Sequence, residues 1–477
     1  MLVPLALAQF VASYACTNMN VAVSSIATDL GTTVIGVQTA ITLFTLTMAA
    51  LMIPGSKLTD IWGRTVCFRL GLVVYGAGGL VAALAPSLAL LIPGYSILEG
   101  VGSALMIPPI YILVTLSSND LATRARGFGV ISAAAGIGAA AGPLIGGLVT
   151  TAISWRASFI LQVLIVGVII VLSRRIVDPG VASARRRFDL VGAILSAAGL
   201  FFIVLGILQS GTYGWFTAKE DVAVGNVVVI TKGGLSPVWI LVGVGALILL
   251  AFFLYAGARE RRGREPLLSP SLFRNRTSNL GLITQNVQWL ILQGAFFVVS
   301  VFLQTIREHN AIETGLILTP ATVGILASSA FAGRLARRRS QRFLVRSGFV
   351  VTVLGMVLLL VLASATSPIA TFVPGLLLMG LGIGVMLTAS VNVVQSSFPE
   401  SEQGEISGLS RSVSNLGSSL GTAIVGSVLV ASTAPGGAPF AYALITVGII
   451  SLIGLGAAML LPPGPPRPAD NVTAEAV

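Results

Sequence analysis

Long apolar runs recur along the whole chain of 477 residues. A helix that crosses the ~30 Å hydrocarbon core of a bilayer needs about 20 predominantly apolar residues. We trace fourteen such runs, at 2–28, 36–56, 66–86, 88–114, 126–151, 156–173, 190–209, 237–257, 278–303, 314–333, 344–364, 369–395, 407–432 and 439–461. The sequence therefore predicts an all-α integral membrane protein with fourteen transmembrane helices.

Charged residues are few and unevenly placed. Asp, Glu, Lys and Arg make up 9% of the chain, against about 25% in soluble domains, which excludes a soluble enzyme or a DNA-binding protein. If the N-terminus is cytosolic, roughly 24 of the 28 basic residues lie in or beside the cytosolic links and in the C-terminal tail, and Arg156, Lys219, Lys232 and Arg307 are left outside. Such asymmetry is the positive-inside rule. It accounts for the net charge of +11 without nucleic acid and predicts a multi-pass cell-membrane protein with both termini cytosolic.

The spans fall into two blocks of six around a central pair. We expect an N-terminal six-helix bundle at 1–175, an inserted helix pair at 189–258 and a C-terminal six-helix bundle at 277–461. Glycines 138, 142 and 147 of the fifth span recur as glycines 417, 421 and 426 of the thirteenth, each 279 residues further on. Matching span order and glycine positions indicate a duplicated transporter architecture with a substrate site between the halves.

Two segments lie outside this pattern. The external loop 210–236 carries two short β-branched runs around Gly225-Asn226, a pattern typical of a β-hairpin. We expect this hairpin to cap the structure, with gating as the alternative. The segment 462–477 is rich in proline and polar residues, which predicts a disordered cytosolic tail.

The link between the second and third spans reads GSKLTDIWGR from Gly55 to Arg64. It resembles the signature loop of the major facilitator superfamily. The resemblance implies a cytosolic gate formed by Gly55, Asp60, Gly63 and Arg64, because an acid and a base at a helix-end interface can pair in one state and separate in another. A basic loop that only sets topology is the alternative. The counterpart around 333–337 lacks the acid.

The fifth span carries the run GAAAGPLIGG from Gly138 to Gly147, which resembles the antiporter motif of exporting major facilitators. Gly138, Gly142 and Gly146 recur every four residues and form a stripe where another backbone can approach closely. Pro143 removes a backbone donor and bends the helix. Pure helix packing is the alternative to a sealing role for this motif, which includes Gly147.

Span number, the central pair and these motifs together resemble the fourteen-span drug:proton antiporter branch of that superfamily. The resemblance implies a secondary active transporter that exports small amphipathic or hydrophobic compounds by proton antiport and alternating access. The first and fourth spans depart from the pattern of the branch. Ala15 stands where an acid is usual in the first span, and Tyr95 and Glu99 stand where the fourth span commonly shows Arg and then Gln.

Glu99 is the one acid in the middle of a predicted span. It lies eleven residues into the run 88–114, about 16 Å deep at 1.5 Å per residue. An ionised carboxylate at that depth costs at least a few kcal/mol, so we expect it to take up and release a proton, with Tyr95 one helical turn away as its hydrogen-bond partner. The alternatives are a permanently protonated structural acid and direct binding of a cationic substrate.

Amide and aromatic side chains form the candidate substrate cavity. Gln285, Trp289 and Gln293 fall on one face of the ninth span, and Phe296 continues it. Polar side chains in a bilayer must face protein or a wet cavity, and interhelical hydrogen bonding is the alternative role. Weaker candidates on the same logic are Asn18, Asn20, Gln38, Asn392 and Asn415.

The sequence does not support hydrolase, metal-binding or cofactor chemistry. The GSSLG run at 417–421 lies in a predicted span, and the single histidine, His309, is in a distant external loop, so a hydrolase triad is excluded. One His and two separated Cys provide no metal cluster, and we expect no cofactor. Expected partners are a small amphipathic substrate, protons and membrane lipid, with the chain monomeric. A lipid or metabolite exporter, a uniporter and a non-transporting membrane sensor remain alternatives on the same fold.

Overall fold

A computed structural model describes residues 2–116, 121–176, 188–224, 227–398, 402–431 and 437–462. Residues 463–477 of the predicted tail 462–477, and the predicted turn residues Gly225 and Asn226, lie outside these ranges. Thirteen helical segments within them are long and apolar enough to cross a membrane. Residues 407–431 of the predicted span 407–432 also lie in a helix, which is serine-rich and stands outside that group of thirteen. The prediction of an all-α integral membrane protein is confirmed.

The first eight helices make up the N-terminal half. They are α1 (Leu2–Asn18), which continues through the 3₁₀ turn η1 (Met19–Ala22) into α2 (Val23–Asp29); α3 (Val34–Trp62); α4 (Arg64–Ala83); α5 (Leu88–Leu91), which continues through the π-helix η2 (Ile92–Glu99) into α6 (Gly100–Leu116); α7 (Leu121–Ala152); and α8 (Trp155–Ser173).

The remaining helices form a central pair and the C-terminal half. The pair is α9 (Leu190–Tyr213) and α10 (Pro237–Arg261), joined through strands β1 (Val222–Val224) and β2 (Val227–Ile230), and the 3₁₀ turn η3 (Pro270–Arg274) follows it. The C-terminal half contains α11 (Arg276–Thr305), α12 (Ala311–Arg338), α13 (Gln341–Leu362), η4 (Ile369–Thr371) with α14 (Phe372–Gln395), α15 (Gln403–Ala431) and α16 (Ala438–Met459).

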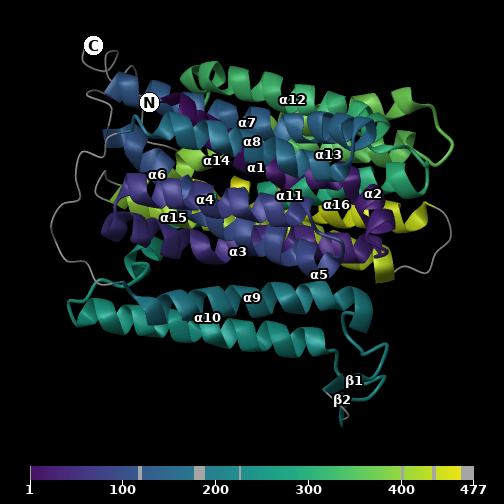
Figure 1. The fold of residues 1–477 in the computed structure, drawn as a ribbon, viewed down its shortest axis with the longest axis horizontal. Helices are drawn as coiled ribbons and strands as arrows, with labels where there is room; N and C mark the ends of the chain where they lie inside the picture. Colours follow the sequence, from purple (N-terminus) through teal and green to yellow (C-terminus); the bar gives the residue numbers. More distant parts are fainter. Residues whose placement is uncertain are drawn as a thin grey trace, which may run out of the picture.

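The central pair lies along one side of the other helices, with the strands beyond the ends of α9 and α10 (Figure 1). β1 and β2 pair antiparallel, as the sequence predicted for this loop. Helix α9 packs against both α3 and α15, whereas α10 packs mainly against α9. The pair therefore touches one helix of each half.

A buried carboxylate fixes the pair at the start of α9. Asp189 caps this helix by accepting from the backbone N–H of Gly192 at 3.1 Å. The same side chain accepts from Tyr255 Oη of α10 at 3.0 Å and from the backbone N–H of Leu267 at 3.1 Å, and Arg259 lies 3.6 Å away. One acid thus joins both helices of the pair to the link that leads into α11.

The two halves touch along helix pairs in which glycine allows backbone contact. An ideal Cβ on Gly147 of α7 would overlap the carbonyl oxygen of Ala311 at the start of α12, and one on Gly315 would overlap the carbonyl oxygen of Pro143. On the other side of the interface, Gly426 of α15 faces the side chain of Gln38 on α3. No larger residue fits at Gly147 or Gly315 without separating the helices, because the atoms that it would meet there belong to the backbone.

We predict that Gly147→Ala lowers the melting temperature of the purified protein in detergent, because the added methyl group pushes α7 from α12. Overpacking of this kind costs about 1–3 kcal/mol. The matched control is Gly136→Ala on the same helix, where an added Cβ meets nothing within 4 Å. The control keeps the melting temperature of the unaltered protein. Equal effects of both substitutions would contradict the described packing.

Candidate functional site

Glu99 ends the π-helical segment η2, whose backbone packs directly on α4. A Cβ on Gly78 would lie 2.7 Å from the backbone nitrogen of Glu99, and one on Gly79 would lie 3.0 Å from Glu99 Oε1. These two glycines let the acid sit against the neighbouring helix. π-Helical turns of this kind occur frequently at functional sites.

The carboxyl group of Glu99 is shut away from solvent. Its exposed fraction is 0%, and neither oxygen has a hydrogen-bond partner among the described residues. The hydroxyl of Tyr75 on α4 approaches it but donates its hydrogen bond to Gln162 on α8. No arginine or lysine in the described part of the chain forms an ion pair with Glu99. The group therefore has little to stabilise a negative charge.

Tyr95 does not make the predicted hydrogen bond to Glu99. Its hydroxyl donates instead to the backbone carbonyl of Ala15 on α1, at 3.2 Å. Its ring stacks on Phe44 of α3 with 4.6 Å between centroids and meets Phe159 of α8 edge-on. The expected pairing is wrong because Tyr95 has its partners on three other helices, so the tyrosine connects η2 to α1.

The signature-loop residues lie where α3 meets α4. Gly55 packs against the backbone carbonyl of Ala104 on α6. Gly63 joins the two helices with a φ of +96°, a conformation that favours glycine, and Arg64 is the first residue of α4. The side chain of Asp60 lies outside the described part of the structure, so its expected pairing with Arg64 stays a prediction.

The glycine stripe of the antiporter-like run faces α1. Gly138 lies against the backbone of Phe10, and Gly142 and Gly146 lie against Thr17 and Asn18. Pro143 lies within α7, and its carbonyl faces Gly315 of α12. The expected close backbone approach is present, and it uses two faces of α7, one toward each half of the chain.

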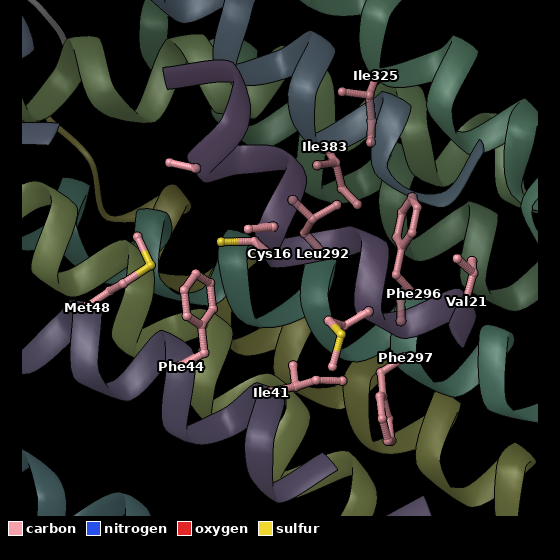
Figure 2. Packing of buried hydrophobic residues seen from close by; sticks show 14 of the residues in the cluster. Cys16, Val21, Ile41, Phe44, Met48, Leu292, Phe296, Phe297, Ile325 and Ile383 are labelled. Carbon is pink, nitrogen blue, oxygen red and sulfur yellow. The ribbon is translucent and has the colours of Figure 1, made fainter. Parts of the chain in front are cut away.

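The predicted cavity residues of α11 are mostly engaged in hydrogen bonds between helices. Gln285 donates to Ser414 Oγ of α15 at 2.7 Å, and Gln293 donates to the backbone carbonyl of Cys16 on α1 at 2.8 Å. Trp289 is half-buried against the core. Figure 2 shows Phe296 in one apolar cluster with side chains of α1 and α3, and it is 1% exposed. In this conformation Gln285 and Gln293 therefore form hydrogen bonds between helices, which was the alternative to a role in the substrate cavity.

The weaker candidates for the substrate cavity differ in their hydrogen bonding and in their exposure. Gln38 donates to the backbone carbonyl of Thr422 on α15 at 3.0 Å. Asn18 Oδ1 and both polar side-chain atoms of Asn20 are buried without a hydrogen-bond partner among the described residues. Asn392 is exposed on α14, and Asn415 is half-buried on α15. The structure thus does not bring these residues to a single site.

Several hydrogen bonds join the halves at the end of the helices where α2 and α12 begin. The backbone carbonyl of Asn20 accepts from Ser300 at 2.7 Å and from Gln304 at 2.9 Å. Gln304 Oε1 also accepts from the backbone N–H of Ser24 at 2.9 Å, and Thr151 accepts from the backbone N–H of Ile312. In the predicted topology this end faces the outside, where these bonds would form an external seal.

Arg411 is a polar residue that the sequence analysis missed. It lies on α15 and donates from a terminal nitrogen to the hydroxyl of Tyr111 on α6, in the other half. Its guanidinium lies over the Tyr111 ring, 4.8 Å from the centroid. The signal was present, because position 411 falls inside the predicted span 407–432, where a basic residue is unexpected.

Comparison with known proteins agrees with this architecture. The family model described as Major Facilitator Superfamily matches residues 5–273, 191–422 and 287–476. The chain is 29% identical to the puromycin resistance protein of Streptomyces alboniger, over 88% of this chain and 79% of the relative. It is 28% identical to the cephamycin export protein of Amycolatopsis lactamdurans, over 95% and 90%, and 26% identical to the multidrug resistance protein Stp of Mycobacterium tuberculosis, over 87% and 72%. The chain belongs to the major facilitator superfamily.

Proposed function

We propose that this multi-pass membrane protein is a drug-efflux transporter of the cell membrane that exports small amphipathic or hydrophobic compounds by proton antiport. Membership of the major facilitator superfamily supports a transporter rather than an enzyme. Relatives that align over most of their length carry names that denote antibiotic resistance and export. Both termini are cytosolic in this proposal, which follows from the positive-inside distribution of basic residues.

The burial of Glu99 carries the proton-antiport part of the proposal. A carboxyl group with an exposed fraction of 0% and no hydrogen-bond partner among the described residues is costly to ionise. It therefore holds a proton while enclosed and releases it when a conformational change admits water from the cytosol. A proton taken up from the outside can in this way drive export.

The external seal supports an alternating-access cycle. The bonds that Gln304 makes to Asn20 and Ser24 join the halves at one end. Opening toward the outside requires them to break, and substrate enters from the cytosol while they are intact. The signature loop, with Asp60 and Arg64, is the corresponding cytosolic gate, and the stripe of Gly138, Gly142 and Gly146 keeps α7 sealed against α1 during the cycle.

The first test is Glu99→Gln, which keeps the size of the side chain and removes its acidity. The protein is reconstituted into proteoliposomes in inside-out orientation, and a pH gradient is imposed across their membrane. The measured quantity is the uptake of a panel of flat amphipathic dyes. We expect the gradient-driven uptake to fall by at least about tenfold, whereas exchange of dye at equal pH on both sides continues, because exchange needs no net proton transfer.

The matched control is Glu260→Gln, at an exposed acid of α10, which leaves gradient-driven uptake unchanged. Undiminished uptake by Glu99→Gln would overturn the proton role of Glu99. Dye movement by the unaltered protein that ignores the pH gradient would favour a uniporter. No movement of any dye would favour the sensor alternative.

A second test concerns the external seal. Gln304→Leu removes two bonds that join the halves, each worth about 0.5–1.5 kcal/mol, and should raise the population that is open to the outside by about fivefold or more. The readout is the rate at which Cys16 reacts with a membrane-impermeant maleimide added to intact cells, in a Cys67→Ser background. Both cysteines are buried in the described conformation, and neither is part of a disulfide.

The control for this test is Gln285→Leu. Gln285 is also buried but forms its hydrogen bonds within the C-terminal half, so its loss leaves the labelling rate of Cys16 unchanged. If Gln304→Leu gives the same rate as this control, the seal does not determine which side is open.

A further inference from the structure

Arg411 is a cation placed inside a helix that packs against both halves. It lies eight residues after the first residue of α15, about 12 Å along the helix. Charged side chains at such positions are costly and usually mark a binding site or transport path. Among the residues that the structure describes, no carboxylate forms an ion pair with Arg411.

The guanidinium is held by neutral groups from the other half. One terminal nitrogen donates to Tyr111 Oη of α6, and Tyr111 Oη donates in turn to Gln9 Oε1 of α1 at 3.3 Å. Gln9 Nε2 donates to Ser13 Oγ at 3.2 Å. This chain of hydrogen bonds fixes the position of the arginine across the interface, but it supplies no negative charge.

Donor capacity remains after these contacts. A guanidinium carries five N–H donors, and the hydrogen bond to Tyr111 is the one that Arg411 makes to the described residues. The side chain is half-buried, so its other donors are not closed off by protein. Asn415, one turn further along α15, is also half-buried and adds an amide on the same face. The Tyr111 ring covers one face of the guanidinium.

We propose that Arg411, with Tyr111, Gln9 and Asn415, forms a subsite for the carboxylate of an amphipathic organic acid. A planar guanidinium matches a carboxylate through two parallel hydrogen bonds, and the aromatic ring accepts the apolar body next to it. A phosphate dianion would require a second cation, which the described neighbours do not provide. This inference rests on the proposed export function and names one class of its substrates.

The test compares two probes that differ only at the charged group, 1-pyrenebutyric acid and 1-pyrenebutyramide. Binding to the full chain in nanodiscs is measured by equilibrium dialysis, with empty nanodiscs subtracted for partition into lipid. We expect the acid to bind at least about tenfold more tightly than the amide. Arg411→Gln should abolish this preference without weakening binding of the amide, and Arg411→Lys should keep part of it.

The matched control is Arg346→Gln. Arg346 is a half-buried arginine of α13 whose hydrogen bonds go to backbone carbonyls at the end of α16, and its loss leaves the preference intact. The melting temperature of each variant shows that it is folded, and Arg411→Lys serves as the second variant if Arg411→Gln does not fold.

Three results would overturn the subsite. The first is equal binding of acid and amide by the unaltered protein, the second is a preference that survives Arg411→Gln, and the third is an equal loss of both probes, which would make Arg411 a link between the halves only. Failure of export itself is distinguishable, because gradient-driven transport of neutral and cationic dyes does not depend on this preference.

Discussion

Direct contact between helix backbones of the two halves is the constraint on which the rest of the structure depends. A bilayer offers no water to polar groups, so they must be satisfied within the protein. Glycines such as Gly147 and Gly315 bring the backbones together, and side chains then reach carbonyl oxygens across the interface, as Gln38 does to Thr422 and Thr322 to Ala140. Both bonds have the ordinary length of 3.0 Å, and a contact stretched to about 3.6 Å is no longer a hydrogen bond. In the proposed cycle the two halves therefore move apart as rigid bodies, with each hydrogen bond either made or lost.

The acid that we assign to proton coupling lies away from this interface, within the N-terminal half. Tyr95 connects the two regions physically: it stands on the π-helical segment that ends at Glu99, and its hydroxyl donates to Ala15 of α1. The next residue, Cys16, accepts from Gln293 of the other half. A change in the charge of Glu99 that moves its segment thus acts on the helix that holds part of the seal, which is a contiguous route for coupling.

The spacing of residues along the chain predicted those features that depend on the helical period or on the length of an apolar run. The spans, the stripe of glycines on α7 and the burial of Glu99 are of this kind. Partners from distant segments could not be read in the same way. Tyr95 was assigned to Glu99 because four residues form one helical turn, but its hydroxyl bonds to a helix 80 residues earlier. Gln285 and Gln293 share a face, yet their acceptors lie on different halves. Arg411 was missed because its charge was taken as part of a cytosolic link.

The central claim is that Glu99 holds a proton while enclosed and gives it up during the cycle. Infrared difference spectroscopy tests it directly, through the C=O stretching band of a protonated carboxyl group in the purified protein and in Glu99→Gln. We predict that the unaltered protein, reconstituted in proteoliposomes, shows this band at neutral pH, that the band decreases when a pH gradient drives transport, and that Glu99→Gln lacks it. A carboxylate signal from Glu99 at neutral pH, or a band that stays constant through turnover, would contradict the claim.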